Sequence, residues 1–152
     1  MQHAEAPIVD GIRQFGVVDP SAAYVLRPGG YAVIVRSSGD VALLSVKGNC
    51  YLPGGGQEDG EDAEAAAVRE ALEECGARIR IIDRIGMADE LVFAAGEQTH
   101  FRKRCTFFRA ELLTEVLSGG ESDHSLIWVS PEQAVSLLRH GSQKWAVAES
   151  AV

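Results

Sequence analysis

The segment at residues 55–77 constrains the fold of this chain more than any other stretch, and it reads GGQEDGEDAEAAAVREALEECGA. Residues 61–74 are almost all good helix formers and include neither Gly nor Pro, so they predict a helix of about four turns. Gly76 stands where such a helix would end, because Gly readily adopts the left-handed conformation of a helix C-terminus. We therefore expect a loop, a helix and a second loop.

Three carboxylates share one face of this predicted helix, because Glu70, Glu73 and Glu74 stand at positions i, i+3 and i+4. Like charges at this spacing repel by a few tenths of a kcal/mol per pair. Glu73 and Glu74 also lie in the last turn, where the helix dipole disfavours anions. A bound divalent cation would reverse the repulsion, and oxygen ligands suit a hard ion, Mg²⁺ first and then Mn²⁺. The alternative is a solvated acidic face.

The whole segment follows a pattern with seven fixed positions, which are filled by Gly55, Glu61, Arg69, Glu70, Glu73, Glu74 and Gly76. Seven residues, each of roughly 7% abundance, match such a pattern by chance at about 10⁻⁸ per start site. The pattern resembles the Nudix box of the MutT-like pyrophosphohydrolases. Its two apolar positions, Ala71 and Ala77, hold the smallest apolar side chain, which is a mild departure from the family.

The resemblance implies a single domain over residues 1–152 with the Nudix fold, an α/β/α sandwich around a mixed β-sheet, of the α+β class. It implies substitution at phosphorus, with Mg²⁺ held by the three glutamates and the carbonyl of Gly54. By the same resemblance, Arg69 and Glu61 hold the loop and the glutamates in place, and Gly55 and Gly76 support the site. A surface ion pair is the alternative for Arg69 and Glu61. The general base is Glu70 or Glu73, and the two stay unseparated.

Further site residues are expected downstream of the box. The family often recruits one more carboxylate from a later loop, and Glu121 is the candidate metal ligand here. Its competitors are Glu90, Glu97 and Asp123, whereas His124 would contact substrate. His100, Arg102 and Arg104 fall on one face of a predicted strand, so we expect Arg102 and Arg104 to bind phosphate oxygens. A solvated strand face is the alternative.

The remaining pattern predicts strands around the box helix and two helices near the C-terminus, which fits an α+β sandwich. Residues 27–30, Arg-Pro-Gly-Gly, predict a turn. The expected strands are residues 24–26, 31–36, 41–46, 50–52, 78–85, 88–93, 99–112 and 126–129. Ser130 to Gln133 has the form of a capping box and predicts a helix that ends near Gly141. A second helix is expected over residues 143–150, and residues 1–21 are expected to form a partly ordered lead-in.

Composition narrows the range of partners and locations. The net charge of −8 argues against non-specific binding to nucleic acid or to an anionic membrane. It leaves a nucleotide substrate open, because a bound metal reverses the local charge. Cys50, Cys75 and Cys105 lack paired spacing and predict free thiols in a reducing cytoplasm. We find neither a signal-peptide pattern nor an apolar stretch of membrane-spanning length.

The sequence indicates the class of reaction more closely than it indicates the substrate. Signatures of the subfamilies acting on ADP-ribose, diadenosine polyphosphates, coenzyme A and NADH are not visible outside the box. A (deoxy)nucleoside triphosphate, or another nucleoside diphosphate linked to a further group, is therefore the default expectation. The alternative is a non-catalytic module that binds a nucleotide-like ligand as a sensor or regulator, which the intact box disfavours. A homodimer is expected because relatives often form one.

Overall fold

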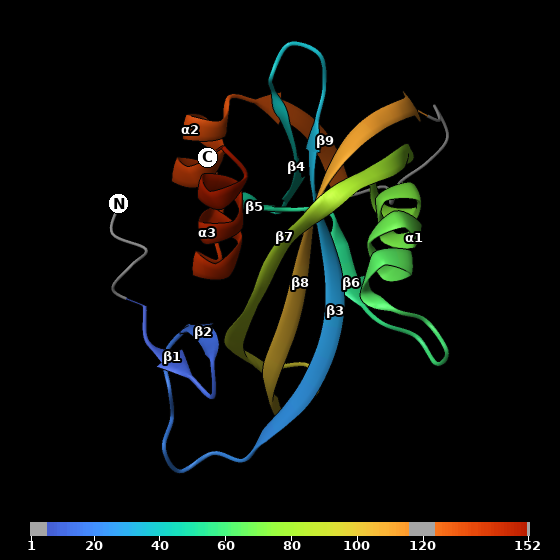
Figure 1. Cartoon of the computed structure of the whole chain (residues 1–152). Helices are drawn as coiled ribbons and strands as arrows, with labels where there is room; N and C mark the ends of the chain where they lie inside the picture. Colours follow the sequence, from blue (N-terminus) through green and yellow to red (C-terminus); the bar gives the residue numbers. More distant parts are fainter. Residues whose placement is uncertain (1–5, 116–123, 152) are drawn as a thin grey trace.

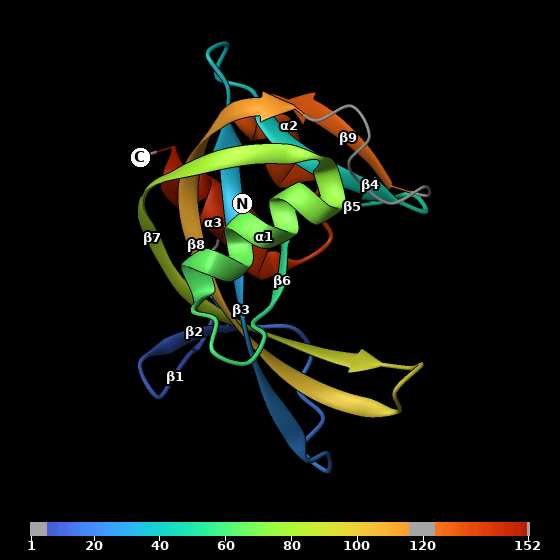
Figure 2. The ribbon, with the colours of Figure 1, turned by 90° about the vertical axis from the view of Figure 1, so that its right-hand side faces the viewer.

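One mixed sheet separates the helices into two layers in the computed structural model, which describes residues 6–115 and 124–151. Helix α1 (Ala63–Cys75) covers one face, and α2 (Pro131–Leu137) and α3 (Gly141–Ser150) cover the other (Figure 1). Turned by 90°, the molecule shows α1 lying across the sheet (Figure 2). This arrangement confirms the predicted α+β class and α/β/α sandwich. In the described ranges, no helix has both the length and the apolar character needed to span a membrane.

Nine strands of the described residues build the sheet: β1 (Ile8–Val9), β2 (Ile12–Phe15), β3 (Tyr24–Val35), β4 (Val41–Val46), β5 (Asn49–Tyr51), β6 (Gly54–Gly56), β7 (Ala77–Ala94), β8 (Thr99–Glu115) and β9 (His124–Val129). Their order is β1-β2-β7-β8-β3-β4-β5, with β6 also paired to β3 and β9 to β4. The β3–β8 and β2–β7 pairs are parallel, and the other pairs are antiparallel.

The prediction of a turn at residues 27–30 is wrong, because β3 runs through them without a break and pairs with β8 along its whole length. Pro28 is tolerated because it lies just beyond the end of the β6 pairing, where its carbonyl accepts a hydrogen bond from the Gln57 N–H at 3.0 Å. The two glycines serve close packing instead of a turn. A Cβ at Gly30 would lie 1.8 Å from the Ala63 carbonyl oxygen at the start of α1.

Two other boundaries differ from the sequence prediction. The strands expected at residues 78–85 and 88–93 are one strand, β7, whose pairing with β8 shifts register at three places and so breaks the alternation of side chains. The expected lead-in contains β1 and β2, and β2 pairs in parallel with β7. A four-residue strand carries too short a pattern to stand out in the sequence.

The C-terminal helices follow the prediction except at one end. The capping box is confirmed, since Ser130 Oγ accepts from the Gln133 N–H at 3.1 Å and Gln133 Oε1 accepts from the Ser130 N–H at 3.1 Å. The first helix ends at Leu137 and not near Gly141, which instead begins α3. The chain leaves the helix because Leu138 forms a bridge with Cys50. Val147 is buried on the inner side of α3, as expected.

Helix α1 packs closely on the sheet through alanines. Ala66, Ala67 and Ala71 are fully buried, and Ala67 and Ala71 belong to one cluster with Ala32 and Ile34 of β3. The small side chain at Ala71 thus shortens the distance between helix and sheet, which explains the mild departure from the family pattern. The close approach of α1 to β3 is what leaves no room for a side chain at Gly30.

Gly30→Ala is expected to lower the free energy of unfolding by about 3 kcal/mol, the upper end of the usual cost of overpacking, because the added methyl meets backbone atoms. Gly96→Ala is the matched control, since a Cβ there has no neighbour within 4 Å. Denaturant titration of both variants measures the difference. Equal stability of the two variants would contradict the close contact between β3 and α1.

Candidate active site

The caps at the two ends of α1 fix the helix that carries Glu70, Glu73 and Glu74. Asp62 caps the N-terminus, where its carboxylate accepts from the Ala65 N–H at 2.8 Å, so Glu61 precedes the helix instead of opening it. Gly76 adopts the left-handed conformation with φ of 64°, as predicted for the helix end. The chain enters β7 directly at Ala77, without the second loop that the sequence suggested. The glutamates of the last turns therefore lie on a helix fixed at both ends.

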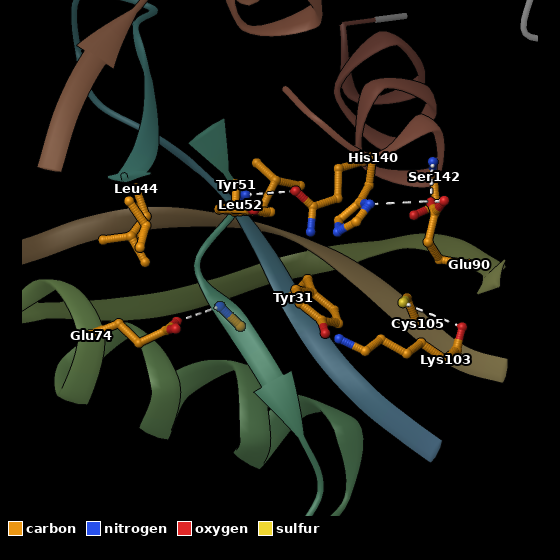
Figure 3. Close-up of a pocket in the computed structure, with 13 residues that line it drawn as sticks. Tyr31, Leu44, Tyr51, Leu52, Glu74, Glu90, Lys103, Cys105, His140 and Ser142 are labelled. Carbon is orange, nitrogen blue, oxygen red and sulfur yellow. Dashed lines mark hydrogen bonds and ion pairs between the residues drawn. The ribbon is translucent and has the colours of Figure 1, made fainter. Parts of the chain in front are cut away.

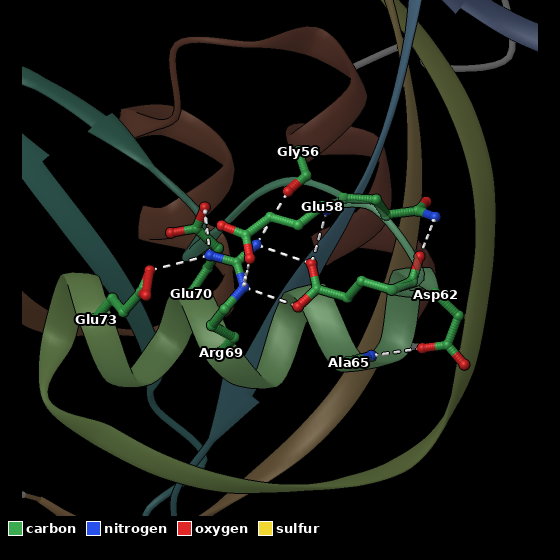
Figure 4. Close-up of polar contacts among 9 residues, drawn as sticks. Gly56, Glu58, Asp62, Ala65, Arg69, Glu70 and Glu73 are labelled. Atoms are coloured by element: carbon green, nitrogen blue, oxygen red, sulfur yellow. Dashed lines mark hydrogen bonds and ion pairs between the residues drawn. The ribbon is translucent and has the colours of Figure 1, made fainter.

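Arg69 connects three parts of the segment (Figure 4). Its guanidinium donates two hydrogen bonds to the Glu61 carboxylate, from Nε at 2.8 Å and from Nη2 at 2.9 Å. It also donates to the Gly56 carbonyl at 3.1 Å and to Glu73 Oε1 at 3.0 Å. Hydrogen bonding from Arg69 lowers the pKa of the Glu61 carboxyl to about 2. The predicted orienting role of Glu61 and Arg69 requires contacts of this kind.

Two of the three box glutamates line a cavity of about 280 Å³ beside the strand β6. Glu74 Oε1 accepts from the Gly54 N–H at 2.9 Å, and Glu70 faces Gly55 so closely that a Cβ there would lie 2.3 Å from Glu70 Oε2. Burial raises the pKa of the Glu70 carboxyl, although Arg69 opposes that rise. Glu73 instead forms an ion pair with Arg69, and its side chain is half-exposed. The structure thus brings Glu70 and Glu74 together with the glycines.

The donors of this cavity fit a hard divalent cation, because they are carboxylate oxygens beside a glycine strand whose missing side chains leave space for an ion. Within residues 6–115 and 124–151, no three His, Cys, Asp or Glu side chains are placed to hold a metal together. The candidate ligand Glu121 and its competitor Asp123 lie outside the described residues, as does the side chain of His124. Glu97 Oε1 lies 3.7 Å from Arg27 Nη1, and Glu97 is not among the residues that line the cavity.

The cations that line this cavity are Arg27 and Lys103, which the sequence reading did not single out. They are direct partners in the β3–β8 register, so they lie side by side on one face of the sheet. Arg102 and Arg104 bind the buried Asp89 instead, Arg104 through two hydrogen bonds of 2.9 Å. The alternation of β8 separates residue 103 from residues 102 and 104, but only the fold shows which face meets the glutamates.

A second cavity, of about 180 Å³, adjoins the first (Figure 3). The two share four lining residues: Tyr31, Gly54, Glu74 and Lys103. Glu90 and His140 line the far part of the second cavity, where Glu90 Oε1 accepts from the Ser142 N–H at 2.9 Å. Burial raises the pKa of Glu90 and lowers the pKa of His140 to about 4. The two cavities therefore meet at Glu74 and Lys103, and the second one is lined by aromatic as well as charged side chains.

Comparison with known proteins agrees with this geometry. A family model described as the NUDIX domain matches residues 20–149. A NUDIX hydrolase from Nitrosomonas europaea superposes with a TM-score of 0.69 at 18% identity, covering 84% of this chain and 89% of that one. A MutT protein from Methanosarcina mazei Go1 superposes with a TM-score of 0.67 at 20% identity, covering 86% and 97%. At these identities the two structures establish the fold.

Two curated proteins are similar in sequence. A putative 8-oxo-dGTP diphosphatase of Bacillus subtilis (strain 168) is 31% identical over 105 residues, which cover 68% of this chain and 66% of that protein. Diphosphoinositol polyphosphate phosphohydrolase 3-alpha of Mus musculus is 32% identical over 113 residues, covering 68% and 64%. The chain thus spans slightly less than two thirds of the length of these relatives.

The half-buried imidazole of His140 predicts a pH dependence of stability. Burial, together with Lys103 and Arg139, lowers its pKa from 6.5 to about 4, although Glu90 lies 3.9 Å from its Nδ1. As the pH falls from 6.5 toward 4, the unfolded chain binds a proton that the folded chain does not, so the free energy of unfolding decreases. His140→Gln is expected to flatten this decline in denaturant titrations across that range. Parallel curves for wild type and variant would contradict the buried neutral imidazole.

Proposed function

The chain belongs to the Nudix family, and from that membership we propose that its 152 residues form one catalytic domain, a Mg²⁺-dependent pyrophosphohydrolase. The proposed substrate is a nucleoside diphosphate linked to another group, with a (deoxy)nucleoside triphosphate as the first choice. One observation carries the proposal: Glu70 and Glu74 meet the glycine strand β6 in a cavity whose other wall presents Arg27 and Lys103. Such a cavity offers oxygen donors to a metal and cations to a diphosphate.

In this proposal, Mg²⁺ is held by Glu70, Glu73, Glu74 and the carbonyl of Gly54, with Glu121 as a further ligand. Mn²⁺ is the second choice of ion, since the same oxygen donors suit it. When bound, the ion would neutralise charge on the diphosphate and lower the pKa of a water molecule that it binds. Arg27 and Lys103 bind phosphate oxygens, for which Arg offers paired donors and Lys a point charge. Arg102 and Arg104 are left out, because Arg104 donates to Asp89 through Nε and Nη2, and Arg102 donates to Gln14 and Asp89 through Nη1.

We assign the general base to Glu70, which takes a proton from the attacking water. Its carboxylate lines the cavity, with Oε2 3.5 Å from Arg69 Nη1, whereas the more exposed carboxylate of Glu73 accepts a hydrogen bond from Arg69 at 3.0 Å. Arg69 acts through its neighbours, because its contacts hold the Glu61 loop and the Gly56 carbonyl in position. Glu73 stays the alternative base, since release from Arg69 would free its oxygens.

The names of the two curated relatives support a diphosphate substrate of small-molecule size, and they differ in whether it is a nucleotide or an inositol phosphate. The rival function is a non-catalytic module that binds a nucleotide-like ligand as a sensor. We also propose a cytoplasmic location, supported by three free cysteines. A homodimer completes the proposal, supported by the exposed apolar side chains of Val25, Leu26 and Phe93.

Glu74→Gln is expected to lower metal-dependent turnover by at least ~10²-fold, the scale of removing one important electrostatic group. The variant keeps the size of the side chain and its helix preference, so folding is expected to be intact. Turnover would be measured on nucleoside triphosphates, oxidised dGTP, nucleotide sugars, ADP-ribose, dinucleoside polyphosphates and diphosphoinositol phosphates, with Mg²⁺, with Mn²⁺ and with chelator. Glu64→Gln, an exposed change on the same helix, is the matched control and should keep wild-type rates.

An unchanged rate in Glu74→Gln would remove the carboxylate cavity from the proposal. Absence of metal-dependent turnover on every diphosphate, together with thermal stabilisation by a nucleotide, would favour the sensor.

A further inference from the structure

The second cavity has the lining of a site for a planar ring. Tyr51 of β5 and His140 place their rings 5.5 Å apart at an angle of 48°, and both line the cavity. Leu44, Val46 and Leu52 supply aliphatic surface beside them. Aromatic and aliphatic side chains of this kind bind nucleobases by stacking, whichever base is present. An inositol ring carrying phosphates would gain little from the same surface.

The charges of the lining residues also favour a nucleotide over an inositol polyphosphate as the ligand of this cavity. Lys103 is the lysine of this cavity, and the carboxylates of Glu74 and Glu90 line it as well. Lys103 is the direct β8 partner of Glu90 on β7 and of Arg27 on β3, so it lies between a carboxylate and a guanidinium on the sheet. A ring bearing several phosphates would bring many negative charges against two carboxylates and one ammonium, which is unfavourable at short range. A neutral base with one phosphate at Lys103 brings fewer negative charges and meets less of this repulsion.

Glu90 supplies a hydrogen-bond acceptor inside the cavity. Its Oε1 accepts from the Ser142 N–H, and its Oε2 lies 3.9 Å from His140 Nδ1, which is beyond hydrogen-bonding distance. A carboxylate offers about four lone-pair sites, so Glu90 keeps acceptor capacity toward the cavity. Lys103 and the Ser142 N–H oppose the rise that burial causes in the Glu90 pKa. Among the common bases, guanine presents two adjacent N–H donors on one edge, which match a carboxylate best.

We propose that the second cavity binds the base of a guanine nucleotide, that Glu90 accepts hydrogen bonds from its N–H edge, and that Lys103 binds a phosphate at the junction with the first cavity. This inference rests on the proposed function, since it takes the diphosphate to lie at Glu70 and Glu74. It assigns Glu90 to base selection and Lys103 to phosphate binding. It also favours the nucleotide over the inositol phosphate as substrate class.

Binding without turnover tests the inference. Isothermal titration calorimetry would measure GMP, AMP, UMP and myo-inositol hexakisphosphate against the full chain in chelator. GMP is expected to bind about tenfold more tightly than AMP or UMP, because a paired acceptor discriminates by about 1–3 kcal/mol. Inositol hexakisphosphate is expected to bind more weakly than GMP.

Single substitutions then separate base recognition, phosphate binding and ring stacking from one another. Glu90→Gln keeps an acceptor for Ser142 but removes one for guanine, so GMP should weaken about tenfold and AMP should change little. Lys103→Met should weaken all three nucleotides, whereas Lys47→Met, an exposed charge-removing control, should leave them unchanged. Tyr51→Leu removes the aromatic face without touching the buried carboxyl, and it should weaken GMP and AMP alike. This last variant tests the ring site even where Glu90→Gln folds poorly.

Three results would overturn the inference. The first is GMP binding that neither Glu90→Gln nor Tyr51→Leu changes, and the second is tighter binding of inositol hexakisphosphate that Lys103→Met abolishes. Metal-dependent turnover of a diphosphate by a chain that binds no GMP would overturn the inference and leave the proposed function standing. GMP binding with the expected variant effects, but without any turnover, would support the cavity assignment and count against the hydrolase.

Discussion

The paired hydrogen bonds between Arg69 and Glu61 are the interaction on which the site depends. They join residues on either side of the helix start, and the same guanidinium holds the Gly56 carbonyl of β6 and the Glu73 carboxylate. Charge-assisted, two-point contacts of this type fix orientation as well as distance. Without them, the loop that precedes α1 would lose its charged contact with the helix that carries the glutamates. Glu74 would still be held to the glycine strand by the hydrogen bond that it accepts from the Gly54 N–H.

Close backbone contact is the second constraint. Gly30 lies under the first turn of α1, Gly54 lies against Tyr31, and Gly55 lies against Glu70, each with no room for a Cβ. These glycines let three elements meet where side chains would otherwise hold them apart. The result is a cavity with carboxylates on the helix side and Arg27 and Lys103 on the sheet side. A diphosphate with its metal would meet opposite charges on its two sides.

Local patterns predicted local structure well. The cap at Gly76, the capping box at Ser130 and the free cysteines are confirmed, because each depends on a few neighbouring residues or on spacing alone. The turn predicted at residues 27–30 and the break predicted in β7 are wrong for a common reason. Both rest on residues that usually end strands, whereas neighbouring strands and α1 supply contacts that outweigh those preferences.

The sequence by itself determined the acidic helix, its C-terminal end at Gly76, the family resemblance and the shared face of the glutamates, since helical spacing is enough to place the glutamates. Only the tertiary structure decided which of them line the cavity, with Glu70 and Glu74 facing β6 and Glu73 drawn to Arg69. It also decided which face of β8 lies toward the glutamates, because alternation along a strand defines two faces and only packing selects one. For the same reason Lys103 and Glu90, far apart in the chain, became visible as neighbours only through strand register.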